Sequence, residues 1–422
     1  MTDDVALLLH RAGFGPTGAE LAAARKAGYA ATLSALISPP GPDVGASSAP
    51  IPVLGMDPFA DKPNPTVAQR SSGDHVRRVQ IEQITKWWLD RMTVADHQAV
   101  EKLLFFWHGH WATSIEKVRS PALMLAQHRT LRQSRDFVDM TRRMIVDPAL
   151  VYWLDGQLNT KASPNENLGR ELMELFTLGI GHYTEKDVKE AGRALTGWRV
   201  SLGSEACFFQ AEQHDKGRKT ILGTTDAFTA RRLVDMLLGR KECPRFIATR
   251  MWYRYASSNR PIPERTRESM ASAFPEPRSM LKVLFADLAF QDTTNTLVKQ
   301  PVEWLVGAMR QLGLRLGGLP AEQLTSIFDG LRALGQLPFA PPSVGGWPAG
   351  GSWLTSAAAQ VRLGLAGTLA TLTAIERTTP EELAYILCLD GWSDRTYAVL
   401  KGVKDARHML TLGLASPEYL VT

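Results

Sequence analysis

The sequence predicts a mainly α fold: a large multi-helix single domain with one short β-hairpin. Three observations lead to this prediction. Long segments carry apolar residues at helical spacing, Gly and Pro separate these segments, and almost no segment alternates apolar and polar residues as a half-buried strand does. The chain has 422 residues, of which 44% are hydrophobic and 22% charged, which is enough to bury a sizeable core. We therefore expect residues 1–422 to form one helical domain.

The first half of the chain shows its helices most clearly. Thr17 followed by Glu20 makes a capping box, which predicts the start of an Ala-rich helix that ends by Gly28. Residues 38–74 are rich in Pro, Gly and Ser and predict a long irregular loop. Apolar periodicity then predicts further helices over residues 76–92, 99–114 and 121–145.

The second half contains the one expected hairpin. β-branched and aromatic residues flank Gly203 and Ser204, so the hairpin is expected over residues 198–210, with a continuation toward 219–223. Helical patterns follow to the end of the chain, and a Gly- and Pro-rich loop over residues 335–355 interrupts them.

Charge and cysteine usage restrict the possible classes of protein. The net charge is +5, but no basic run concentrates it, so we expect no nucleic-acid partner. No apolar run is long enough for a membrane span, and the N-terminal residues lack an export signal, so we expect a cytoplasmic protein without a membrane partner. Three cysteines without CxxC spacing argue against a disulfide framework.

Two histidines lie in the most apolar stretch of the chain, LLFFWHGHWATS. In one unbroken helix His108 and His110 would point to nearly opposite sides, so they would not bind one metal ion together. Burial keeps an imidazole neutral, and the neutral form is the one that ligates iron or zinc. Each histidine is therefore a candidate metal ligand, and the alternative is a core histidine that is hydrogen-bonded to its surroundings.

A second group of polar residues lies in PNENLGRELMELF. Asn167, Arg170, Glu171 and Glu174 follow at helical spacing, and leucines and a phenylalanine form the apolar side. Charged residues beside an apolar stripe usually form a solvated face or an internal ion pair, but this ridge begins beside a polar loop and ends before GIGHYTE, which favours a pocket wall. His182 lies just before Thr184, an expected helix N-cap, and is a candidate for a pocket rim.

The chain resembles the bacterial family known as domain of unknown function 1800. The resemblance rests on FWHGHWATS, on the segment from PNENLGRELMELF to ALTGW, and on PFAPPSVGGWP with the terminal LASPEYL, and it covers nearly the whole chain. It implies a helical fold and a shared set of polar motif residues, without assigning them a role.

The expected function follows from what the sequence lacks and what it retains. The motifs GxSxG, GxGxxG, HExxH and CxxCH and a P-loop are absent. Neutral histidines amid aromatic residues favour an iron-dependent oxidoreductase with non-covalent haem b, or otherwise with non-haem iron or another divalent metal. It would oxidise a small-molecule or peptidyl substrate, which the net charge predicts to be acidic, with dioxygen or peroxide.

The expected roles divide the candidate residues. His108 or His110 would be the metal ligand, Asn167 and Glu174 would help bind the cofactor, and the residues for oxygen activation and proton delivery would be Arg170, Glu171 and His182. Two rival classes stay open: a non-catalytic scaffold or partner-binding protein, and a metal-dependent hydrolase with a His and carboxylate site.

Overall fold

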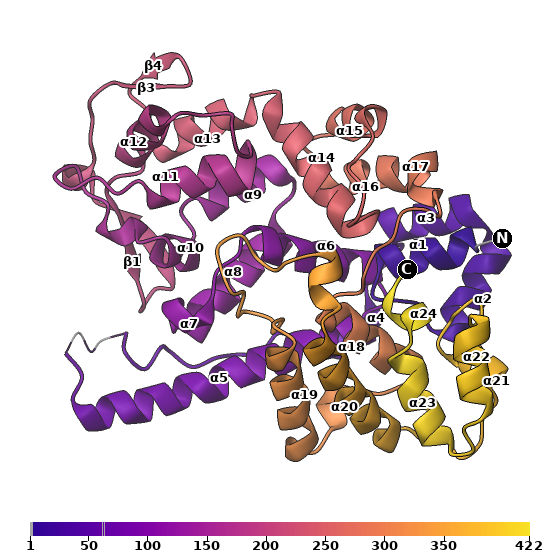
Figure 1. Ribbon diagram of the computed structural model, residues 1–422. Coiled ribbons are helices and arrows are strands. Elements are labelled where there is room, and N and C mark those ends of the chain that lie inside the picture. The colour runs from indigo at the N-terminus through magenta and orange to yellow at the C-terminus, as the bar shows by residue number, and fades with distance from the viewer. Residues whose placement is uncertain (1–2, 61, 63) are drawn as a thin grey trace.

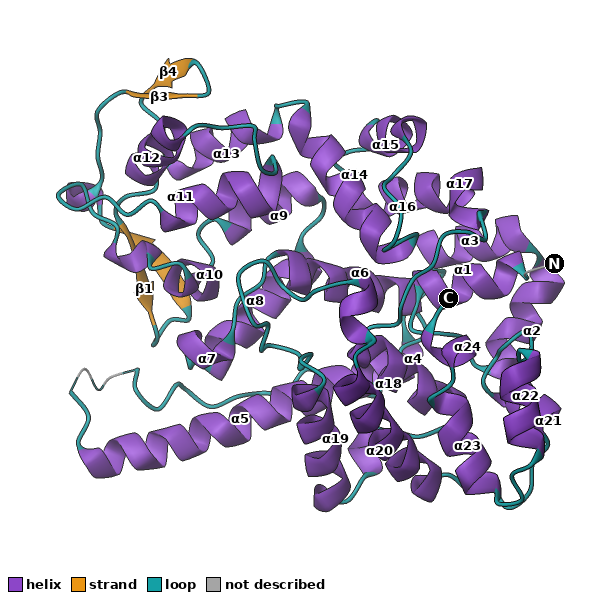
Figure 2. Cartoon of the chain, viewed as in Figure 1, coloured by secondary structure: helices purple, strands orange, loops and turns teal. Residues whose placement is uncertain are grey.

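The computed structural model describes residues 3–60, 62 and 64–422 (Figure 1). This part of the chain is dominated by helices, and its named strands form two small antiparallel hairpins (Figure 2). The prediction of a mainly α fold with a short hairpin is confirmed.

The N-terminal helices pack together beside the C-terminal end of the chain (Figure 1). The capping box of Thr17 and Glu20 begins the second helix as expected, and Gly28 ends it with a φ of 82°. The helices of this segment are α1 (Asp4–Ala12), α2 (Gly18–Ala27), α3 (Tyr29–Ile37) and α4 (Val44–Ser47).

Helix α5 (Val67–Val94) begins earlier than the sequence pattern predicts. A capping box of Thr66 and Gln69 starts it, so the irregular excursion ends at residue 66 instead of 74 and also contains α4. The predicted loop includes residues 61 and 63, which lie outside the described residues. The first half of α5 projects from the molecule, and the described residues of the excursion before it lie alongside it (Figure 1). No helix in the described ranges is long and apolar enough to cross a membrane.

The central helices follow α5. The single helix expected over residues 121–145 is two helices, because the side chain of Asp136 accepts the backbone N–H of Asp139 and starts a new helix there. These helices are α6 (Gln98–His110), α7 (Ile115–Val118), α8 (Pro121–Gln133), α9 (Phe137–Met144) and α10 (Pro148–Trp153).

In sequence, the two hairpins lie between the central helices and the helices of the second half of the chain. Strands β1 (Trp198–Ser201) and β2 (Ala206–Phe209) form the expected hairpin, with Trp198 opposite Phe209. A second hairpin pairs β3 (Lys219–Ile221) with β4 (Thr224–Asp226). The surrounding helical segments are η1 (Gly156–Leu158), α11 (Asn167–Glu171), the π-helix η2 (Leu172–Thr177), α12 (Glu185–Ala194) and η3 (Ala211–Gln213).

The second half of the described chain returns to helices. The loop expected over residues 335–355 is present and contains one short helical turn, η5. The elements are α13 (Ala230–Leu238), α14 (Glu242–Tyr255), α15 (Glu264–Ala271), α16 (Pro277–Ala286), α17 (Leu288–Gln291), α18 (Pro301–Gln311), η4 (Leu316–Gly318), α19 (Ala321–Ala333), η5 (Gly350–Trp353), α20 (Ser356–Leu372), α21 (Pro380–Ile386), α22 (Asp394–Lys401), α23 (Ala406–Leu414) and α24 (Pro417–Leu420).

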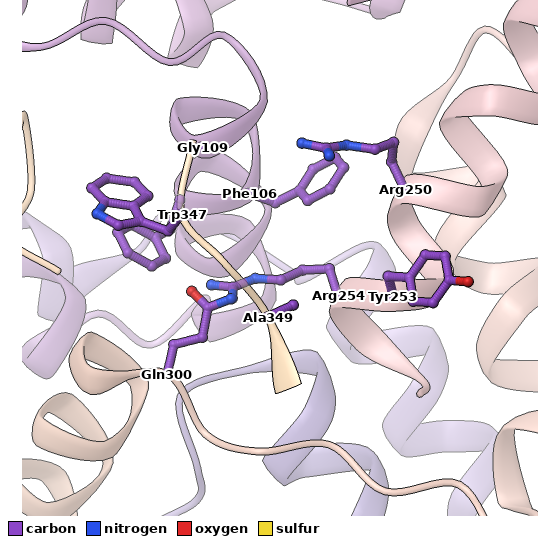
Figure 3. A pocket seen from close by; sticks show the side chains of 9 residues that line it. Phe106, Gly109, Arg250, Tyr253, Arg254, Gln300, Trp347 and Ala349 are labelled. Carbon is purple, nitrogen blue, oxygen red and sulfur yellow. The ribbon is translucent and has the colours of Figure 1, made fainter. Parts of the chain in front are cut away.

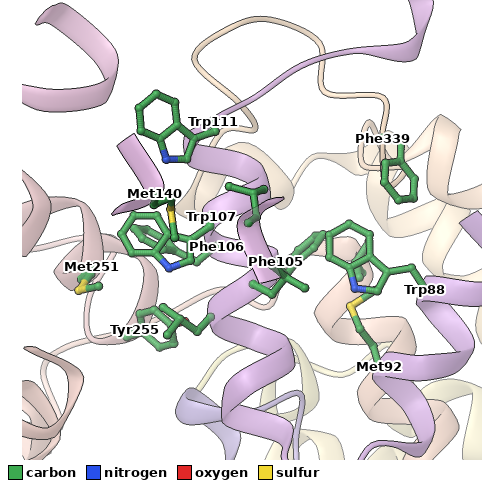
Figure 4. Close-up of a cluster of buried hydrophobic side chains, with 14 of the residues drawn as sticks. Trp88, Met92, Phe105, Phe106, Trp107, Trp111, Met140, Met251, Tyr255 and Phe339 are labelled. Carbon is green, nitrogen blue, oxygen red and sulfur yellow. The ribbon is translucent and has the colours of Figure 1, made fainter. Parts of the chain in front are cut away.

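Helix α6 lies in the middle of the core. It packs against α1, α3, α5 and α8, and all but two of its residues are buried. Figure 4 shows how Phe105, Phe106 and Trp107 leave α6 in different directions, toward Trp88 on one side and Tyr255 on another. Most buried hydrophobic side chains form one large cluster that includes residues from both ends of the chain, and a small second cluster contains Ala6, Leu21 and Cys388. A helix buried on every side, as the sequence pattern predicts, therefore forms the centre of this protein.

Candidate functional site

His108 is buried among aromatic rings near the end of α6. Its ring centroid lies 4.9 Å from that of Trp88 and 5.2 Å from that of Phe339. Its Nε2 accepts a hydrogen bond from the backbone N–H of Phe339 at 3.0 Å. Phe339 has a φ of 66°, which is uncommon for a non-glycine residue. His108 therefore holds the start of the 335–355 loop in a special conformation.

His110 faces a different set of neighbours, as its helical spacing from His108 predicts. Its Nε2 lies 3.1 Å from the backbone oxygen of Phe176, and because a carbonyl only accepts, Nε2 carries the proton. Phe176 lies near the end of the π-helix η2, where carbonyl groups lack partners within the helix. Phe137 and Phe246 pack on the same imidazole. His110 thus joins α6 to the end of η2.

Both imidazoles are neutral in this environment. Burial lowers the pKa of His108 to about 3, and burial together with the nearby Arg250 lowers the pKa of His110 to about 3. Both histidines are buried, as the sequence predicts. Each ring also has a hydrogen-bond partner.

The histidines do not fit the expected role of iron ligands. The Nε2 lone pair of His108 already accepts the Phe339 N–H. The Nε2 of His110 carries a proton, and its Nδ1 is enclosed by aromatic side chains that a flat macrocycle would have to displace. Across residues 3–60, 62 and 64–422, no three His, Cys, Asp or Glu side chains lie close enough to hold a metal ion together.

The polar ridge on α11 and η2 is largely engaged in local contacts. The two Nη atoms of Arg170 donate to the two carboxylate oxygens of Glu185, at 2.8 and 2.7 Å. The side-chain amide of Asn167 donates to the backbone oxygen of Leu154 at 3.3 Å. The Arg170–Glu185 pair is solvent-exposed, so this part of the ridge forms a solvated face.

The carboxylates of the ridge lie beside a tyrosine. The Tyr183 hydroxyl donates to Glu174, and burial together with Glu174 raises the pKa of Glu171. His182 is exposed next to them. The structure thus brings Glu171 and Glu174 together, while His110 contacts this region through the backbone oxygen and the ring of Phe176.

A cavity of about 270 Å³ opens on another face of α6 (Figure 3). It is enclosed by α6, by α14 and by the 335–355 loop, with the N-terminal end of α18 below. We call it the α6–α14 pocket, and its lining residues are Phe105, Phe106, Gly109, Arg250, Tyr253, Arg254, Gln300, Trp347 and Ala349. Ligand pockets usually have volumes of roughly 300–1,000 Å³, so this cavity lies just below that range and has room only for a small molecule.

The close approach of the 335–355 loop to α6 requires a glycine at position 346. A Cβ on Gly346 would lie 2.2 Å from the backbone oxygen of Gly109, whereas a Cβ on Gly109 would make an ordinary van der Waals contact of 3.6 Å with the Trp347 ring. Gly346 also has a φ of 83°, which glycine adopts without strain. The loop can therefore press Trp347 directly onto α6, where it stacks on Phe105 at 5.8 Å between centroids.

Two arginines supply the charge of the pocket. Arg250 and Arg254 are four residues apart on α14, and both guanidinium groups extend toward the side where Trp347 lies (Figure 3). The only cause of the lowered pKa of Arg250 is burial, and among the described residues it has no ion pair or hydrogen bond. A half-buried guanidinium without an acidic partner is costly, unless something else supplies the negative charge.

Gln300 presents its amino group, not its oxygen, to the pocket. The backbone N–H of Val302 can only donate, so the Gln336 side-chain oxygen accepts it at 2.9 Å. The Gln336 amino group then donates to Gln300 Oε1 at 2.5 Å. With Oε1 occupied in this way, the free side of the Gln300 amide is its NH₂ group, which is a donor.

Behind the pocket lies a buried cluster of charges around one carboxylate. Glu303 Oε1 lies 2.9 Å from Lys102 Nζ and 3.3 Å from Arg254 Nη2. Lys299 lines the small cavity next to Lys102 and Glu303, and burial lowers its pKa to about 7. Cations therefore outnumber carboxylates on this side of the pocket.

The sequence interpretation did not select the arginine pair or assign Trp347 to a site. The segment ECPRFIATRMWYRY has basic residues on several helix faces, and nothing local distinguishes Arg250 from Arg245. The one available signal was the GGWP turn, whose two glycines indicate a close approach of the backbone to something else.

These features define the class: an all-helical protein with an aromatic-walled, arginine-bearing pocket. The model of the family described as protein of unknown function (DUF1800) matches residues 7–421, and the chain belongs to this family. Its motifs FWHGHWATS and PFAPPSVGGWP, on which the resemblance rests, meet at the α6–α14 pocket. No curated protein and no solved structure matches the chain.

Proposed function

We propose that this protein binds a small organic anion in the α6–α14 pocket. The observation that carries the proposal is Arg250, a guanidinium at a cavity wall without an acidic partner among the described residues. A carboxylate or phosphate group would form charge-assisted, bidentate hydrogen bonds with it. In the low-dielectric pocket, such a bond is worth more than on the surface.

The rest of the wall supports the same ligand chemistry. Phe106 and Trp347 offer apolar surface for a hydrophobic body, while Arg254 and the Gln300 amino group offer further donors. The net charge of the chain predicts an acidic substrate, and a small organic anion agrees with that prediction.

Binding is better supported than catalysis. Among the described residues lining the pocket, none is a histidine, carboxylate, cysteine or serine that could act as a general base or nucleophile. The proposal therefore belongs to the non-catalytic class of functions. Oxidation with haem b and metal-dependent hydrolysis both need a ligand set that the histidines do not provide.

Titration calorimetry with benzoate tests the proposal. Wild-type protein should bind benzoate, and Arg250→Met should weaken binding at least about tenfold, because the anion loses its unpaired guanidinium partner. Arg245→Met is the matched control: Arg245 lies on the same helix but pairs with Glu264 and Glu268 at the surface. Equal affinities of the two variants would contradict the proposal.

A further inference from the structure

Gln300 places a hydrogen-bond donor without a protein partner at the wall of the α6–α14 pocket. Its side chain lines the cavity, and the residue is only 8% exposed. Its Oε1 accepts from the Gln336 amino group at 2.5 Å, while its own amino group donates to no acceptor among the described residues. A poorly solvated donor without a partner costs free energy, and a ligand that accepts a hydrogen bond there would remove that cost.

The surrounding protein fixes the orientation of this amide. The backbone N–H of Val302 takes up the Gln336 oxygen at 2.9 Å, so Gln336 can offer only its amino group to Gln300. Gln336 is completely buried and has no water-exposed alternative. Turning the Gln300 amide over would bring two amino groups together. The pocket therefore presents a donor at this point and selects a ligand group that accepts.

Gln300 and Arg250 act on different parts of a ligand. Figure 3 shows the Gln300 amide, which lies just before α18, well separated from the guanidinium group that Arg250 extends from α14. A single carboxylate cannot contact both side chains. If the carboxylate pairs with Arg250, Gln300 meets a second group at the other side of the cavity.

The cations near this side of the pocket are engaged elsewhere. Arg254 Nη2 lies 3.3 Å from Glu303 Oε1. Lys102 and Lys299 line the small cavity next to Glu303 and not the α6–α14 pocket, and burial lowers the pKa of both amines. The donor without a partner on this side is therefore the uncharged Gln300 amide, which suits a neutral carbonyl oxygen.

We infer that the ligand is a single-ring carboxylate that carries a neutral carbonyl group on the side of the ring away from the carboxylate. This inference rests on the proposed anion-binding function. The carboxylate pairs with Arg250, and the carbonyl oxygen accepts from Gln300. The ring lies against Phe106 and Trp347, and the volume of about 270 Å³ limits the ligand to about one ring with a short substituent.

Calorimetry with two isosteric benzoates tests this inference on the unaltered protein. 4-Acetylbenzoate and 4-isopropylbenzoate have the same charge and nearly the same shape, but only the acetyl group contains an acceptor. Wild-type protein should bind 4-acetylbenzoate at least about fivefold more tightly, because 4-isopropylbenzoate leaves the Gln300 amino group without a partner. The isopropyl group is more apolar, so the hydrophobic effect alone would give the opposite order.

The outcomes separate the inference from the proposed function. Equal affinities, or tighter binding of 4-isopropylbenzoate, would overturn the carbonyl acceptor and leave anion binding in place. Binding of benzoate without binding of either substituted benzoate would show that the side of the pocket opposite Arg250 is closed, which also overturns the inference. Absence of binding by all three compounds would overturn the proposed function together with the inference.

A variant at position 300 assigns the preference to the amide. Gln300→Met keeps the length of the side chain without its donor, so the preference for 4-acetylbenzoate should disappear while the affinity for benzoate stays within about twofold. Gln83→Met is the matched control, since Gln83 is exposed on α5, and it should keep the wild-type preference. A preference that persists in a Gln300→Met variant with native circular dichroism would overturn the role of Gln300. The comparison of the two benzoates on wild-type protein does not depend on this variant.

Discussion

At the scale of single residues, the two histidines of α6 show how a functional-looking motif arises from packing. His108 holds a strained turn of the 335–355 loop through the Phe339 N–H, and His110 caps the end of η2 through the Phe176 carbonyl. Their burial and opposite directions could be predicted from helical periodicity. Their partners could not, because both lie more than 60 residues away in the sequence.

The role of His108 can be tested through stability. His108→Ala would leave the Phe339 N–H without an acceptor and open a cavity between aromatic rings, so the free energy of unfolding should fall by about 1–3 kcal/mol. His182→Ala is the control, since His182 is exposed and its loss should change stability by less than about 0.5 kcal/mol. Urea unfolding followed by circular dichroism measures both, and equal stabilities of the two variants would refute the assigned role.

At the scale of elements, the sequence pattern predicts most helices but not how they meet. Capping chemistry identified the start of α2, and the same chemistry at Thr66 and Asp136 explains why α5 begins early and why α8 and α9 are separate. The π-helix η2 has no comparable signal, because a change from α to π hydrogen bonding does not alter the apolar pattern of ELMELF.

The pocket belongs to the same scale, since it exists only where three elements meet. Helix α6 supplies Phe106, α14 supplies the arginines, and the loop supplies Trp347. Taken alone, helices α6 and α14 have sequences that are typical of any helical protein. The polar ridge of α11 and η2 looked more site-like in sequence because its residues lie together locally, yet Arg170 is paired with Glu185.

At the scale of the whole molecule, one large hydrophobic cluster contains most of the described core and includes residues from both ends of the chain. That core encloses several neutral histidines. Burial lowers the pKa values of His10, His108 and His110 to about 3, and it raises the pKa of Asp147 to about 7. Acid should therefore lower the stability of the entire fold and not that of one region alone.

The stability of the protein should fall steeply between pH 6.5 and pH 5. In this range His10, His108, His110 and His128 each take up a proton on unfolding, because burial lowers the pKa of all four in the native protein, whereas Asp147 releases one. The net effect is that of three protons, about 4.1 kcal/mol per pH unit once the unfolded histidines are charged. Guanidinium unfolding at several pH values measures the slope. A free energy of unfolding that stays constant from pH 7 to pH 5 would show that these side chains are solvated in the native protein.

The most direct measurement is a crystal structure of the protein soaked with 4-bromobenzoate. The central claim predicts an anomalous bromine peak inside the α6–α14 pocket, near Phe106 and Trp347, and carboxylate oxygens within hydrogen-bond distance of the Arg250 guanidinium. A bromine peak only at other positions, or a carboxylate turned away from Arg250, would contradict the claim that this pocket is built to recognise an anion.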